Sequence, residues 1–193
     1  MDNYAPFSEK IRMLYTAMDQ KYKAVADYYG FHCTGCRENC CLTRFYHHTF
    51  SEYFYLLEGY KTLTSEKRAT VKEIAREVCR KMTDADKKGQ TARFMCPLNS
   101  DGLCLLYAYR PMICRLHGIP SELRRPGQNA AYSPGCEAFT AECGGKDYFK
   151  FDRTPFYVEM AGMEAELRRV TGISQKLRMT VAEMLTSEKF DGQ

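Results

Sequence analysis

Apolar residues near the N-terminus recur at intervals of three and four positions, which is the spacing of one helical face. The pattern runs from Phe7 to Tyr29, and Gly30 follows it as a residue that commonly ends a helix. Charged and polar side chains occupy the positions between, so one face of this helix is expected to be buried. The same reasoning predicts four further helices, over residues 51–60, 65–88, 154–170 and 174–188.

Capping residues set the expected helix boundaries. Ser51 is the predicted N-cap of the second helix, and Thr154 and Pro155 are predicted to supply the N-cap and the first helical residue near the C-terminus. Gly89 and Gly172 are placed to end the third and fourth helices. No run of five or more residues alternates as a strand would, and no β-α-β rhythm is present. We therefore predict a mainly α fold.

The helices divide the chain into scaffold and centre. We expect a single domain over residues 1–193, with helical arms at 1–30 and 154–193 and a cysteine-cluster region at 31–149 that contains a helical insert at about 51–89. Beyond the insert this region is rich in Pro, Gly, Asn and Ser, and so long a stretch without regular structure is uncommon in a compact domain. A bound metal is therefore expected to order the centre.

Composition points to the chemistry of that centre. Ten of the 193 residues are cysteine. The first ten residues lack the basic-then-apolar form of a secretory signal, and no stretch approaches ~18 continuous apolar residues, so a cytoplasmic protein without membrane spans is expected. In a reducing compartment clustered thiols bind metal or perform redox chemistry more often than they form disulfides. The formal charge of +4 is too mild to indicate a nucleic-acid partner.

The first cysteine block contains Cys33, Cys36, Cys40 and Cys41. Two residues separate Cys33 from Cys36, and this spacing forms a knuckle whose sulfurs can reach one ion. If the segment were helical, the first three sulfurs would share a face and Cys41 would point about 100° away. Cys40 and Cys41 are then expected to serve different metals, or one of them is not a ligand.

The second block contains Cys96, Cys104 and Cys114, and Cys136 follows later in the chain. A turn signal at residues 99–102 could bring Cys96 and Cys104 together. The Arg-Pro pair at 110–111 is expected to stop a short helix just before Cys114. With the first block, these residues give eight predicted metal ligands.

Two arginines flank the second block. Arg110 and Arg115 are predicted to bind the cofactor by donating hydrogen bonds to sulfurs and offsetting thiolate charge, the alternative being ordinary surface ion pairs. Cys79 is expected to be a packed thiol, and Cys143 is left open. The four histidines lie near cysteines and could support or replace a sulfur ligand, although hydrogen-bonding roles are favoured: His32, His47, His48 and His117.

At these two blocks the chain resembles the YkgJ-like cysteine-cluster family, named for its CxxCxxCC signature and described as zinc- or iron-chelating. The matching pieces are the first block, Cys96-Pro97-Leu98, Gly102-Leu103-Cys104, Tyr107 ahead of Arg110-Pro111, Cys114-Arg115, and Cys136. The chain has three residues between Cys36 and Cys40 where the signature has two. The resemblance covers roughly residues 33–136 and implies an eight-cysteine metal site. Some proteins with similar cysteine sets, such as flagellin lysine methylases, look like iron-sulfur proteins.

Thiolate ligands suit both zinc and iron-sulfur clusters. The irregular spacing, the vicinal cysteines and the flanking arginines favour one or two iron-sulfur clusters of the 4Fe-4S type. The expected function is electron transfer, or assistance to a redox or group-transfer reaction, with an unidentified redox or protein partner. The alternatives are a structural zinc module that mediates protein–protein interaction, and a protein that handles non-cluster iron or copper. No nucleotide, hydrolase or metalloprotease motif is present, so the sequence leaves enzymatic activity open.

Overall fold

The computed structural model describes residues 4–33 and 40–187, and 58% of these residues are helical. Their strands form two short antiparallel pairs, β1 (Asn99–Ser100) with β2 (Leu103–Cys104) and β3 (Ser121–Leu123) with β4 (Ala131–Ser133). The predicted mainly α fold is confirmed. In this part of the chain no helix has the length and apolar character needed to cross a membrane.

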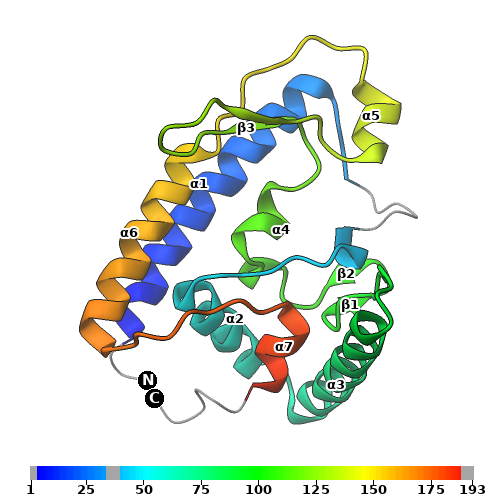
Figure 1. Ribbon diagram of the computed structural model, residues 1–193. Helices are drawn as coiled ribbons and strands as arrows, with labels where there is room; N and C mark the ends of the chain where they lie inside the picture. The colour runs from blue at the N-terminus through cyan, green and yellow to red at the C-terminus, as the bar shows by residue number, and fades with distance from the viewer. Residues whose placement is uncertain (1–3, 34–39, 188–193) are drawn as a thin grey trace.

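The two longest elements of one half of the molecule are α1 (Ala5–Tyr29) and α6 (Thr154–Thr171), which run side by side (Figure 1). The predicted apolar face of α1 is buried, with Ile11 and Met18 fully enclosed. Gly30 ends the helix in the left-handed conformation at φ 64°, as the sequence predicts. These residues pack with α4 (Met112–Leu116) and α5 (Glu137–Cys143) into one apolar cluster.

A second apolar cluster lies under α2 (Phe50–Thr62), α3 (Ser65–Lys87) and α7 (Val181–Thr186), which gather at the other end of the molecule (Figure 1). The predicted stripe of α3 contributes Val71, Ala75 and Met82 to this core. Tyr109, in the 3-10 helix η2 (Tyr107–Tyr109), packs against both clusters. The cysteine-bearing loops therefore lie where the two halves of the core meet.

Two predicted helix starts are corrected. The N-cap of α2 is Thr49, because its hydroxyl accepts a hydrogen bond from the Glu52 N–H at 3.3 Å, while Ser51 lies inside the helix. The N-cap of α6 is Arg153, and Thr154 is the first helical residue. Both observed caps lie within two residues of the predicted ones.

The prediction of a last helix from 174 is wrong, because α7 includes only Val181–Thr186. Thr180 caps this helix in a reciprocal arrangement with Glu183. The preceding residue, Met179, is extended and pairs with His47 through backbone hydrogen bonds of 2.8 and 3.1 Å. Glu188, the predicted end of that helix, lies outside the described residues.

Replacing Gly59 with alanine is expected to lower the free energy of unfolding by about 1–3 kcal/mol. Gly59 lies in α2, and a Cβ atom there would overlap the Tyr109 ring. That ring also packs on Tyr55, with ring centroids 4.9 Å apart, so moving it away from the new Cβ atom would disturb this contact. Urea unfolding of both proteins measures the difference.

The matched control is Gly162→Ala in α6. A Cβ atom at this position meets nothing within 4 Å, so alanine is expected to raise the stability by up to about 1 kcal/mol through its helix propensity. Equal stability changes in the two variants would contradict the close packing of α2 on η2.

Candidate metal centre

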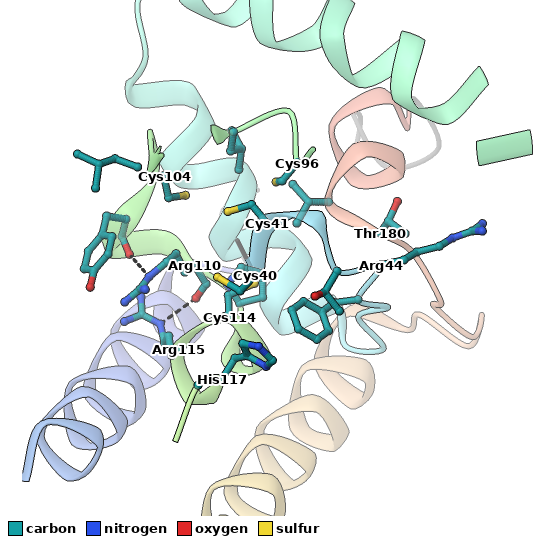
Figure 2. Close-up of a pocket in the computed structure, with 18 of the residues that line it drawn as sticks. Cys40, Cys41, Arg44, Cys96, Cys104, Arg110, Cys114, Arg115, His117 and Thr180 are labelled. Carbon is teal, nitrogen blue, oxygen red and sulfur yellow. Dashed lines mark hydrogen bonds between the residues drawn. The ribbon is translucent and has the colours of Figure 1, made fainter. Parts of the chain in front are cut away.

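A cavity of about 530 Å³ opens between the two halves of the molecule. Every predicted cysteine ligand that the structure describes lies on its wall, and several of them are drawn in Figure 2. These are Cys33, Cys40, Cys41, Cys96, Cys104, Cys114 and Cys136. The eighth, Cys36, lies outside the described residues, as do the other residues from 34 to 39 of the segment for which a helical face was considered. All cysteines in the described part of the chain are free thiols.

The hairpin of β1 and β2 brings Cys96 and Cys104 together, which confirms the turn predicted at 99–102. Asn99 pairs with Cys104, and the turn between the strands uses positive φ angles at Asp101 (52°) and Gly102 (86°). Three residues before the paired Asn99, the Cys96 N–H donates to the Cys41 carbonyl at 2.9 Å. The first cysteine block is thereby attached to the second by backbone hydrogen bonding.

Cys114 lies in the short helix α4, whose first residue is hydrogen bonded to a side chain of α2. The 3-10 helix η2 ends at Tyr109 with Arg110 as its C-cap, and Pro111 is the N-cap of α4, so Cys114 lies inside a new short helix that begins at Met112. The Met112 N–H donates to Glu52 Oε1 at 2.9 Å. Glu52 is 5% exposed and reaches across from α2, so one buried carboxylate sets the position of the helix that carries Cys114.

Cys136 is the N-cap of α5, and its sulfur accepts a hydrogen bond from the Phe139 N–H at 3.4 Å. The Cys136 N–H in turn donates to the Gly118 carbonyl at 2.9 Å. Gly135 precedes it with φ 93°, and a Cβ atom there would lie 2.8 Å from the Gly118 oxygen. The sequence did not indicate this capping role of Cys136.

The two predicted arginines both line the cavity. Arg110 stacks on Tyr107 with its guanidinium carbon 3.5 Å from the ring centroid, and its charge favours the thiolate forms of Cys41, Cys104 and Cys114. This is the charge-offsetting part of the role predicted for it.

Arg115 is 4% exposed, and the hydrogen bonds found for it go to oxygen atoms. It donates to the Arg110 carbonyl at 2.8 Å, to the Ala108 carbonyl and to the Asp19 carboxylate. These bonds join η2 and α4 to α1, a structural role that the sequence did not indicate. Its charge still acts in favour of the Cys104 thiolate.

The thiols differ in how readily they lose a proton. A hydrogen bond from Cys40 lowers the pKa of Cys41 to about 6, and the same bond together with burial raises the pKa of Cys40. Burial raises the pKa of Cys96 to about 12 and also raises the pKa of Cys114. Metal binding at Cys96 and Cys114 must therefore release protons.

The remaining cysteines lie away from the cavity wall. Cys79 Sγ lies 3.7 Å from the Thr186 hydroxyl, and Cys143 is buried with its sulfur 3.5 Å from the Tyr29 carbonyl. Of the histidines, His47 and His117 line the cavity. Burial lowers the pKa of both, which keeps their rings neutral at pH 7.

The donor set that lines the cavity has the chemistry of a thiolate metal site, because soft sulfur ligands hold zinc and iron-sulfur clusters. No group of three or more His, Cys, Asp or Glu side chains that could hold a metal ion is found within residues 4–33 and 40–187. Tyr22 also lines the cavity, and burial together with Cys33, Cys136 and Cys40 raises its pKa. Sequence periodicity placed Tyr22 only on the apolar face of α1.

Fold and cavity together define a mainly helical protein with a cysteine-lined centre. Comparison of the chain with protein-family models, with curated proteins and with solved structures finds no match. The argument for function therefore depends on the residues that surround the cavity.

Proposed function

We propose that the protein binds one or two iron-sulfur clusters through its cysteines and serves in electron transfer or assists a redox or group-transfer reaction. The observation that carries the proposal is the gathering of seven thiols, from segments as distant as Cys33 and Cys136, around one cavity of about 530 Å³. Thiolates are the ligands of 4Fe-4S clusters, and a space of this size exceeds what one metal ion needs.

In this proposal the cysteines hold the cofactor and the surrounding residues adjust its environment. Arg110 and Arg115 offset the negative charge of the thiolates, because both guanidinium groups border the cavity. Val78, Phe94 and Leu98 form part of an apolar wall that limits access of water. A bound cluster supplies one-electron chemistry, while the chain sets its solvent exposure and the charge around it.

The resemblance to the YkgJ-like cysteine-cluster family supports the same assignment. Those cysteines of the resemblance that the structure describes line the cavity, including Cys96, Cys104 and Cys114. Free thiols in this number suit a reducing compartment, so we include a cytoplasmic location in the proposal.

Cys114→Ser is expected to lower bound iron and acid-labile sulfide to about half of the wild-type content or less, because a thiolate ligand is lost. Protein purified without oxygen is analysed for iron, zinc and sulfide, and for broad absorption near ~400 nm. The matched control is Cys79→Ser, which lies outside the cavity and can keep the contact with Thr186.

Unchanged iron and sulfide in Cys114→Ser would contradict the proposal. Wild-type protein that holds one or two zinc ions per chain and no sulfide would also contradict it, and would identify the chain as a structural zinc module.

A further inference from the structure

We propose that Tyr107 is a positioning residue, which holds the Arg110 guanidinium group at the cavity wall so that its charge acts on the metal centre. Tyr107 is 60% exposed and also lines the cavity, so its ring lies where the cavity opens to solvent. This inference deepens the proposed function and rests on it. Arg110 offsets negative charge, and Tyr107 decides where that offsetting charge lies.

The backbone between Tyr107 and Pro111 turns the Arg110 side chain back onto η2. Arg110 is the C-cap of that 3-10 helix, with φ −57° and ψ 136°. Pro111 disfavours a helical conformation at the residue before it, so the turn ends at Arg110 and the chain becomes extended. The Arg110 Nε–H donates to the Tyr107 carbonyl at 3.0 Å. The side chain therefore folds back over the turn that precedes it.

The Tyr107 ring supplies a second attachment for the same side chain. The guanidinium carbon of Arg110 lies 3.5 Å from the ring centroid, which is a stacked cation–π contact. The Arg110 side chain is 18% exposed, although the neighbouring Tyr107 is 60% exposed. The ring thus takes the exposed position and covers the guanidinium group. One residue holds Arg110 at two points, through its carbonyl oxygen and through its ring.

The charge of Arg110 is only weakly offset by a carboxylate. Asp19 Oδ1 lies 4.0 Å from Arg110 Nη2, while Asp19 Oδ2 binds Arg115 Nη1 at 2.5 Å. Asp19 is therefore mainly the partner of Arg115. Arg110 borders the cavity together with Cys104 and Cys114 (Figure 2). A positive charge that is shielded from water acts more strongly on charges in the same cavity.

The position of Arg110 is expected to affect the reduction potential of a bound cluster. Reduction by one electron adds one negative charge to the cluster, and a positive charge nearby favours the reduced form. Without the ring, the Arg110 side chain is free to turn toward water, where its charge is screened. Loss of the ring should therefore lower the reduction potential.

The test compares reduction potentials of protein loaded with iron and sulfide without oxygen, with dithionite as the electron donor. In Tyr107→Ala we expect a tenfold shift of the reduction equilibrium toward the oxidised form, which lowers the potential by about 59 mV for one electron. Tyr107→Phe keeps the stacked ring and should keep the wild-type potential. The matched control is Tyr132→Ala in β4, which removes a 56% exposed tyrosine away from the cavity wall and should change nothing.

A double-substitution cycle shows whether the ring acts through Arg110. Arg110→Gln removes the charge and should lower the potential at least as much as Tyr107→Ala does. In the Arg110→Gln background, Tyr107→Ala should add no further shift. An equal shift with and without Arg110 would overturn the proposal, as would an unchanged potential in Tyr107→Ala. Loss of iron in Tyr107→Ala would show a structural role instead and would also overturn it.

The position of the guanidinium group is tested separately in metal-free protein. The Arg110 Nε–H is hydrogen bonded and covered by the ring, so its proton should exchange slowly with water and give a nuclear magnetic resonance signal. The signal is assigned by its absence in Arg110→Gln, and we expect it to be lost in Tyr107→Ala and kept in Tyr107→Phe. A signal that persists in Tyr107→Ala would overturn the positioning role and leave the proposed function intact.

The identity of the metal separates this inference from the proposed function. If wild-type protein holds zinc without sulfide, the proposed function fails, and the rate of zinc release to a chelator replaces the potential. Tyr107→Ala should then release zinc faster than wild type, because a charge that stabilises the thiolates is lost, and Tyr107→Phe should not. Equal release from Tyr107→Ala and wild type would overturn the positioning role. A wild-type chain that binds neither iron nor zinc overturns both.

Discussion

Loading the protein with iron and sulfide is expected to slow amide hydrogen exchange at least ~100-fold at three positions of the cysteine region, which corresponds to about 2.8 kcal/mol of added protection. The positions are the N–H groups of Cys96, Leu105 and Cys136, which donate across loops rather than within helices. Between them lie only strands of two or three residues, a 3-10 turn and the five-residue α4. Elements this short have little stability of their own. A bound metal is therefore expected to add the most stability to the part of the chain with the least regular structure.

The control lies in the same molecule. Met18 and Leu167 are fully buried in α1 and α6, and their amides belong to helices of 25 and 18 residues. Their exchange should change less than about threefold on loading, because their protection comes from apolar packing. Exchange is followed by mass spectrometry on loaded and metal-free protein at one pH. Equal protection of the Cys96 amide in both forms would show that the central region is ordered without metal.

Sequence-based reasoning succeeds where nearby residues decide the structure. The apolar spacing from Phe7 to Tyr29 defines α1, because burial of a helical face is a local property of the sequence. The turn at 99–102 is equally local, since positive φ at Asp101 and Gly102 suits those residue types. Both features could be predicted, and both help to position the cavity.

Choices that depend on distant partners could not be predicted in this way. Residues 174–180 have helix-compatible spacing, but Met179 pairs with His47 and Thr180 caps α7, so the helix starts seven residues late. Cys136 and Cys143 both lie beside glycine in the sequence. The fold places Cys136 on the cavity wall and Cys143 under the Tyr29 carbonyl, a difference that only tertiary packing reveals.

The same limit applies to the charged residues that organise the centre. Arg115 was singled out for its position after Cys114. Its hydrogen bonds, however, go to the backbone carbonyls of Ala108 and Arg110 and to the Asp19 carboxylate of α1. Glu52 carries no motif at all, and its importance comes from burial beside the start of α4. Buried charges need partners, and here Asp19 for Arg115 and Met112 for Glu52 lie far away in the sequence.

Replacing Glu52 with alanine is therefore expected to lower the free energy of unfolding by about 2–4 kcal/mol. The substitution leaves the buried Met112 N–H without its acceptor and removes the carboxylate that binds the Thr49 hydroxyl at 2.8 Å. It thereby weakens the start of α2 and the start of the helix that carries Cys114. Urea unfolding of the metal-free protein, followed by circular dichroism, measures the loss.

Two further variants test whether the loss of stability comes from the buried hydrogen bonds. Glu52→Gln keeps a carbonyl oxygen for the Met112 N–H, so about half of the stability loss should be recovered. Glu73→Ala removes a carboxylate that is 75% exposed and paired with Arg76 at 3.2 Å, and should change stability by less than about 0.5 kcal/mol. If Glu52→Ala costs no more than Glu73→Ala, the carboxylate does not hold α4 in place. The position of Cys114 would then have to come from the apolar packing of Met112 and Leu116, which are buried on either side of it.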